Sequence, residues 1–164
     1  MPNTRTELLI IELNEFCPSY LRKLAIKYNL YYLNKFLDFR HTYTISNEEK
    51  EFEGLDPWVQ WVSIHGGIPF SEHKIARLGQ TKIQNGKQIW NKLSLSKNIK
   101  WGVWGAMNAT SGVIKEKCFF LPDPWSFEEQ AYPSALNELL DLPRYVAKNY
   151  LELKTIKIIK YFFR

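Results

Sequence analysis

The stretch DPWVQWVSIHGG, residues 56–67, carries the clearest start and stop signals for a helix in this chain. Asp56 can accept hydrogen bonds from the free backbone N–H groups at a helix start. Pro57 suits the first helical position, where the N–H that proline lacks would have no partner. The glycines at 66–67 suit the helix end, because glycine adopts the left-handed conformation without steric cost. We therefore predict a helix that begins after Asp56 and runs to about His65.

Predicted strands and helices alternate on both sides of this stretch. The strand candidates are apolar or rich in β-forming residues, and the helix candidates show capping or periodic patterns. Such alternation is typical of an α/β fold with a mainly parallel sheet and flanking helices. Three or four strands make an incomplete core for this class. The strands are predicted at 6–13 (buried on both faces), 40–45, 100–104 and 119–121, and the further helices at 20–28 with Ser19 as its cap, 31–38, 86–95, 134–140 and 143–163.

The excess of positive charge lies at one end of the chain. The 164 residues carry a formal net charge of +5, and residues 144–164 contain six basic residues and one acid. Residues 1–143, which we expect to form one α/β domain, carry equal numbers of acidic and basic residues. We therefore expect no nucleic-acid groove across this domain. The pattern in 144–164 predicts a basic amphipathic helix, which either packs on the sheet or contacts an anionic membrane surface.

Cysteine content and apolar runs bear on location. Cys17 and Cys118 are too few for a disulfide scaffold, and we expect both to be buried small hydrophobic residues. The N-terminal sequence has no export signal, and no apolar run is long enough to span a membrane. We therefore expect a cytoplasmic protein.

The three histidines match no helical metal-binding spacing, and we expect packed or surface roles for them.

Chemistry in parallel sheets is found in the loops at the carboxyl ends of strands, here after Leu13, Ile45 and Trp104. The oxygen ligands Glu12, Asn14 and Glu15 at the end of the first predicted strand suit a divalent cation, although carboxylates in such a loop also simply face water.

The start of the helix after Asp56 is a second candidate, because free N–H groups and the helix dipole favour an anion such as phosphate or sulfate. Trp58 and Gln60 would then contribute to anion binding. The alternative is an ordinary capped helix.

In combination these segments resemble the N-terminal half of the alkaline phosphatase superfamily, which contains phosphatases, phosphodiesterases of the nucleotide pyrophosphatase type and sulfatases. The resemblance covers roughly residues 6–125. Its first strand corresponds to residues 8–15, and the family's Thr-Gly, Pro and His-Gly-Ile pattern corresponds to residues 63–75. The helix and strand that continue the family pattern correspond to residues 88–93 and 100–105.

The resemblance implies a divalent metal, Zn or Mn, and a phosphoester or sulfoester substrate. Asn14 stands where the family has its first metal-binding aspartate, and Asp56 with Pro57 stands at the nucleophile position. Lys74 follows His73 where the family has glycine. The family's other metal ligands lie in a C-terminal half that this chain does not contain. We therefore expect a truncated relative that is inactive alone. The alternative is a non-catalytic relative that binds an anion or a partner protein.

Overall fold

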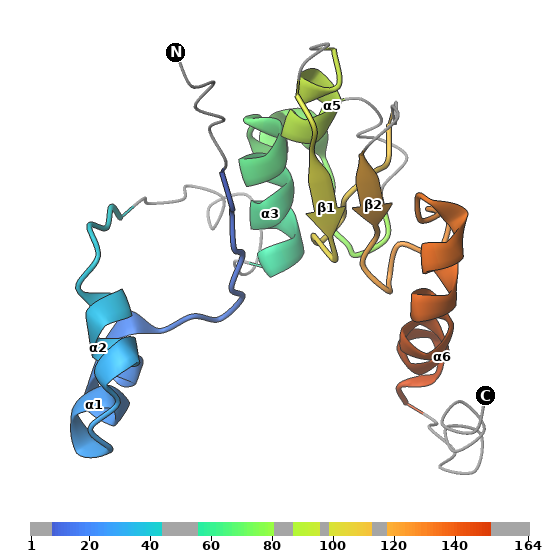
Figure 1. The fold of residues 1–164 in the computed structure, drawn as a ribbon. Coiled ribbons are helices and arrows are strands. Elements are labelled where there is room, and N and C mark those ends of the chain that lie inside the picture. Colours follow the sequence, from blue (N-terminus) through green and yellow to red (C-terminus); the bar gives the residue numbers. More distant parts are fainter. Residues whose placement is uncertain (1–7, 44–55, 81–86, 96–98, 113–117, 152–164) are drawn as a thin grey trace, which may run out of the picture. The chain divides into compact units, whose positions relative to one another are not determined.

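The computed structural model describes residues 8–43, 56–80, 87–95, 99–112 and 118–151 (Figure 1). The chain divides into two compact units, Met1–Asn47 and Glu48–Arg164. It is a small α/β fold, with helices and a two-stranded parallel sheet among the described residues. The coarse fold class predicted from the sequence is thus confirmed. The domain boundary expected between residues 143 and 144 stays a prediction.

A helical hairpin forms the N-terminal unit. Helix α1 (Pro18–Lys27) and helix α2 (Tyr31–Leu37) pack together, and both helices were predicted from the sequence. The Arg22 guanidinium on α1 donates hydrogen bonds to Asp38 Oδ1 at 2.8 Å and to the Leu37 carbonyl at 2.7 Å. The predicted cap at Ser19 is wrong, because Pro18 occupies the first turn and the cap position falls on Cys17.

The two strands predicted in this unit are wrong for the part of the chain that the structure describes. Residues 8–13 and 40–43 belong to no strand there, and residues 6, 7, 44 and 45 lie outside the described ranges. Leu8 is 83% exposed and Leu9 is 81% exposed, whereas the prediction had this segment buried on both faces. An apolar run favours an extended chain, but a strand also needs a hydrogen-bonding neighbour.

Three helices open the described part of the C-terminal unit. Helix α3 (Pro57–Gly66) has Asp56 at its cap position and ends at Gly67, which is left-handed with φ 66°. The prediction for this helix is confirmed. Helix α4 (Phe70–His73) follows, and helix α5 (Ile89–Leu93) is shorter than the predicted 86–95, because Gln88 is extended at its start.

Strands β1 (Gly102–Trp104) and β2 (Phe119–Leu121) run side by side in the same direction (Figure 1). Gly102 pairs with Phe119, and an antiparallel bridge joins Phe120 to Tyr132 on the other side of β2. The ring of Phe119 occupies the space of a side chain at Gly102: a Cβ there would lie 2.0 Å from the ring. Both strands were predicted, and β2 has the predicted bounds.

The two faces of this sheet pack against different elements. Successive side chains of a strand point to opposite faces, so Val103 and Phe120 face one way and Leu121 the other. The first face packs with the α5 side of the unit, and the second packs with the segment that contains Leu140. The first cluster comprises Trp90, Trp101, Val103, Ala109, Cys118 and Phe120, and the second comprises Leu121, Ala131 and Leu140.

The segment predicted as a helix at 134–140 is a 3₁₀ helix, η3 (Ser134–Leu140), and it leads directly into α6 (Asp141–Asn149). Two of the basic residues of the predicted amphipathic helix 144–164 are used in packing. Arg144 donates hydrogen bonds to the carbonyls of Ser126 and Glu129, and the Lys148 ammonium lies 5.0 Å from the centre of the Phe127 ring. Burial lowers the pKa of Arg144. The rest of the predicted helix, from residue 152, lies outside the described residues.

The two neighbouring phenylalanines of β2 give a matched test of this core. Phe120 is 0% exposed and Phe119 is 42% exposed. We expect Phe120→Ala to lower the free energy of unfolding by about 3–5 kcal/mol, because it leaves a cavity in the first cluster. Phe119→Ala should cost about 1 kcal/mol. Urea unfolding followed by tryptophan fluorescence measures both, and equal losses would contradict the assigned faces.

Candidate functional site

Two polar residues, Asn108 and Asp123, lie in contact at the carboxyl ends of β1 and β2. Asn108 lies in the loop after β1, one of the three loops predicted to carry chemistry, and Asp123 lies just after β2. The backbone N–H of Asn108 donates to Asp123 Oδ2 at 3.0 Å. Trp125 N–H donates to Asp123 Oδ1 at 2.9 Å, and the Ser126 hydroxyl donates to Oδ2. Asp123 is only 5% exposed, so these donors replace the water that a carboxylate would otherwise bind.

Asn108 joins segments that are far apart in the sequence. It is fully buried and has a left-handed backbone, with φ 54°. Its Oδ1 accepts from Gly79 N–H at 2.8 Å, and its Nδ2 donates to the carbonyls of Trp58 and Arg77 at 3.4 Å and 3.3 Å. One amide therefore connects the first turn of α3, the 77–79 segment and the end of β1.

Gln88 extends this arrangement towards α5. Its Nε2 donates to the Asn108 carbonyl at 2.8 Å, and its Oε1 accepts from the Thr110 N–H and hydroxyl at 2.7 Å and 3.0 Å. The Trp90 indole N–H donates to the Thr110 carbonyl at 2.8 Å. We call Gln88, Asn108, Thr110, Asp123 and Ser126 the buried polar network. Its donors and acceptors are directed at one another or at backbone groups of the same unit, which suits it to hold the loops in place.

The sequence-predicted residues Asp56, Trp58 and Gln60 lie together at the start of α3. Asp56 is half-buried, and its carboxylate makes no capping hydrogen bond, so the predicted side-chain cap is wrong. Its backbone carbonyl instead accepts from Val59 and Gln60 N–H at 3.0 Å and 3.3 Å. The Trp58 indole N–H donates to the Ala76 carbonyl at 2.9 Å and is therefore not available to an anion. The predicted anion contact of Trp58 would have to come from its backbone N–H in the first turn of α3.

A serine and a histidine pair between α3 and α4. Ser63 Oγ and His73 Nε2 are 3.0 Å apart, and Ile75 N–H donates to His73 Nδ1 at 3.0 Å. Because Nδ1 is the acceptor, the neutral ring carries its proton on Nε2 and donates to Ser63. In this tautomer His73 cannot take a proton from the serine. His73 is 1% exposed, which confirms the expected packed role.

The predicted metal ligands Glu12, Asn14 and Glu15 belong to the N-terminal unit. Glu12 is half-buried, and Asn14 and Glu15 form an exposed turn in which Glu15 has φ 55°. Within the described ranges, no three His, Cys, Asp or Glu side chains lie close enough together to hold a metal ion. Glu12 and Glu15 are two carboxylates, fewer than the three side chains that such a group needs.

The two cysteines differ in environment. Cys118 is buried as predicted, but the prediction is wrong for Cys17, which is exposed just before α1. The Ser19 hydroxyl, 3.4 Å from the Cys17 thiol, and the Tyr20 backbone N–H lower the pKa of Cys17.

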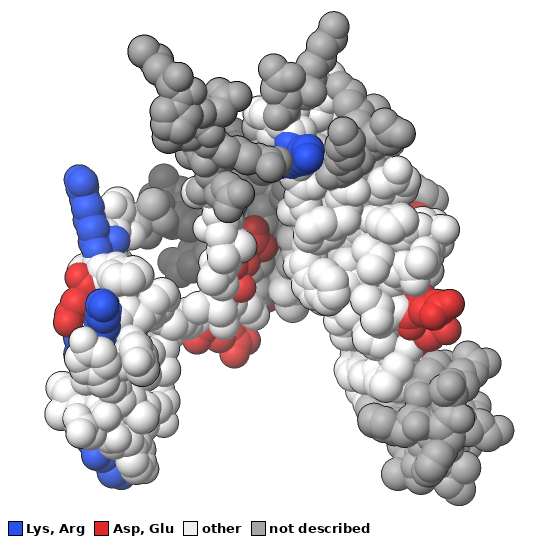
Figure 2. Space-filling model, in the orientation of Figure 1, with Lys and Arg blue, Asp and Glu red and all other residues white. Residues whose placement is uncertain are grey.

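Charge is unevenly spread on the surface of the C-terminal unit. On the face drawn in Figure 2, the described surface over β1, β2 and η3 is mostly uncharged.

Among the described residues, no helix is both long and apolar enough to cross a membrane.

Comparisons with known proteins give no match: no family model fits this sequence, and no curated protein or solved structure is significantly similar to it.

Two substitutions at one position separate the hydrogen bonds of Asn108 from its backbone strain. We expect Asn108→Gly to lower the free energy of unfolding by about 2–4 kcal/mol, because buried partners lose their hydrogen bonds. Asn108→Ala should cost about 1 kcal/mol more, because alanine resists the left-handed conformation. Urea unfolding measures both, and losses below about 0.5 kcal/mol would show that the network does not hold these loops.

The thiols give a prediction that depends on pH. Because the pKa of Cys17 is lowered, its thiolate forms at lower pH than that of an ordinary cysteine, and alkylation by iodoacetamide should follow. Ser19→Ala should move the midpoint of the rate profile to higher pH. Cys118 is the internal control and should react only after unfolding; equal reactivity in the native protein would contradict the structure.

Proposed function

We propose that this chain carries the N-terminal part of an alkaline-phosphatase-like α/β fold, related to metal-dependent phosphodiester or sulfate ester hydrolases. Alone, it binds the anionic group of such an ester without hydrolysing it. The observation that supports the proposal most is the start of α3. There the carboxylate of Asp56 makes no capping hydrogen bond. The helix start itself is held in place by the buried polar network, through the hydrogen bond from Asn108 to the Trp58 carbonyl.

The order and ends of several elements support the same ancestry. Helix α3 ends at the glycine pair, and β1 lies within the segment that continues the family pattern. Parallel pairing of β1 with β2 agrees with a sheet of the predicted kind. Asp56 stands at the nucleophile position of the resemblance, so we assign it the catalytic position that a complete relative would use.

The metal assignment rests on Glu12, Asn14 and Glu15 alone. A bound Zn or Mn ion would supply charge stabilisation for the ester oxygens. These residues offer carboxylate and amide oxygens in or beside an exposed turn, but they lack the further charged ligands of a closed site. We therefore assign them a partial site and assign no reaction step to it.

The hydrogen bonds of the Asp123 carboxylate support inactivity of the chain alone. Asp123 lies at the carboxyl end of β2, where parallel sheets place reactive groups, yet its oxygens already accept hydrogen bonds from Asn108, Trp125 and Ser126. It is therefore a positioning residue. The same observation favours the second candidate function, a non-catalytic relative that binds an anion or a partner.

Calorimetry and a hydrolysis assay on the full chain test the proposal. With Mn or Zn ions present, bis(4-nitrophenyl) phosphate and 4-nitrophenyl sulfate should be hydrolysed no faster than with the metal alone. Phosphate or sulfate should bind, and Asp56→Asn should tighten that binding by about twofold to fivefold, because it removes a negative charge beside the helix terminus.

Glu72→Gln, which removes an exposed carboxylate on α4, is the matched control and should leave the affinity unchanged. Metal-stimulated hydrolysis that Asp56→Asn abolishes would contradict inactivity and make Asp56 a nucleophile in this chain. Absence of phosphate and sulfate binding in both the unchanged chain and Asp56→Asn would contradict the binding proposal.

A further inference from the structure

The N-terminal unit contains a concave pocket that the proposed function does not use. Its volume is about 780 Å³, which lies in the range of pockets that bind small organic molecules. Residues of α1, α2 and the segment that follows α2 line it. All of these residues belong to one compact unit.

One side of the pocket is aromatic. Phe16 and Phe36 meet edge to face with ring centres 5.9 Å apart, and Phe36 and Phe39 lie 5.8 Å apart. Phe36, Phe39 and Tyr43 are 44%, 61% and 78% exposed, so these rings present open apolar surface to a ligand. A planar ring can stack on such surface or meet it edge to face.

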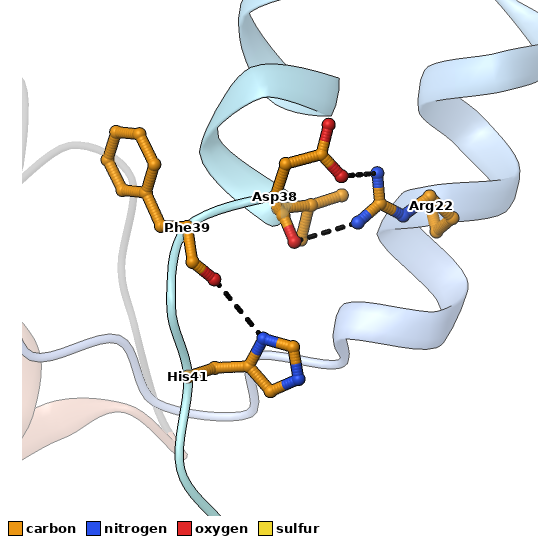
Figure 3. Close-up of polar contacts among 5 residues, drawn as sticks. Arg22, Asp38, Phe39 and His41 are labelled. Carbon is orange, nitrogen blue, oxygen red and sulfur yellow. Dashed lines mark hydrogen bonds and ion pairs between the residues drawn. The ribbon is translucent and has the colours of Figure 1, made fainter.

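The polar side of the pocket is cationic. Arg22, Arg40 and His41 line it, and no Asp or Glu is among the described lining residues, although Asp38 pairs with Arg22 and offsets part of its charge. The ion pair with Asp38 and the bond to the Leu37 carbonyl fix the Arg22 guanidinium in one orientation (Figure 3). His41 Nδ1 lies 3.2 Å from the Phe39 carbonyl (Figure 3). A carbonyl only accepts, so Nδ1 carries the proton and Nε2 of the neutral ring is an acceptor, which leaves the guanidinium groups of Arg22 and Arg40 as the donors for an anion.

The start of α1 adds to the positive potential here. Pro18 and Ser19 line the pocket at the N-terminal end of α1, which is the positive end of the helix dipole. Next to this helix end, the pKa of Cys17 is lowered by the Ser19 hydroxyl, by the backbone N–H groups of Tyr20 and Ser19 and by the charge of Lys23. A negative group is therefore favoured on this side of the pocket.

We propose that this pocket binds an organic anion that carries an aromatic ring, with the ring against Phe36, Phe39 and Tyr43 and the anion beside Arg22 and Arg40. Aromatic phosphates, sulfates and carboxylates share this chemistry. The site does not depend on the proposed hydrolase ancestry, and it lies in a different unit from Asp56.

NMR titration of the full chain with phenylphosphonate tests the proposal, with the ring signals of His41 as the local readout. We expect these signals to shift, while those of His65 and His73 in the C-terminal unit stay in place. Inorganic phosphate and benzyl alcohol each lack one half of the ligand and should bind at least about tenfold more weakly. Phenyl sulfate and benzoate should also bind more tightly than benzyl alcohol, and the tightest ligand identifies the preferred anionic group.

Two exposed lining residues give variants that should leave the hairpin folded. Arg40→Gln should weaken phenylphosphonate binding by about fivefold to tenfold, because it removes a charged donor. Tyr43→Ala should weaken it by less. Lys35→Gln, an exposed cation on α2 outside the pocket, should change nothing.

Three outcomes would overturn the proposal. The first is the absence of any His41 shift at millimolar phenylphosphonate, and the second is benzyl alcohol binding as tightly as phenylphosphonate. The third is an affinity that falls as much in Lys35→Gln as in Arg40→Gln, because general charge would then explain the binding. Asp56→Asn should leave the His41 titration unchanged, so failure here and failure of the α3 proposal are separate results.

Discussion

The C-terminal unit depends on one buried amide. Asn108 has no exposed surface and a left-handed backbone, and its side chain contacts the backbone of Gly79, Trp58 and Arg77. A buried amide without partners is costly, so these three segments must stay in one arrangement for it to be satisfied. The strands of the sheet are only three residues long, and such a short ladder gives little stability by itself. The network around Asn108 supplies a connection between α3 and β1 that the sheet does not.

Local signals in the sequence predicted local structure well. The start of α3 at Pro57 and its end at Gly67 follow from residue types whose conformations are restricted within one turn. Strands β1 and β2 follow from short apolar segments. The segment 8–13 has an equally apolar pattern, but a strand is defined by its partner, and the pattern says nothing about a partner. The same reason explains why residues 40–43 were predicted as a strand and are not one.

The candidate site was predicted in part. The rule that chemistry lies at the carboxyl ends of strands pointed to the loop after Trp104, where Asn108 lies. The same rule applies to Asp123, two residues after β2, but the loops predicted to carry chemistry were those after Leu13, Ile45 and Trp104. Its role could not be read from the sequence, because the donors from Asn108 and Ser126 reach it only in the folded chain. The capping interpretation of Asp56 failed for a related reason: its position was right, but its side chain does not bond to the helix.

The two units differ in how their polar groups are satisfied, and this decides where a ligand can bind. In the buried polar network, each donor faces an acceptor of the same unit, so a ligand would have to break existing hydrogen bonds to enter. Arg40 and His41 line an open pocket and keep donors or acceptors directed at solvent. Binding there displaces water without breaking such hydrogen bonds, and the fixed guanidinium of Arg22 lowers the entropy lost on binding. The first arrangement maintains a fold, and the second is suited to recognition.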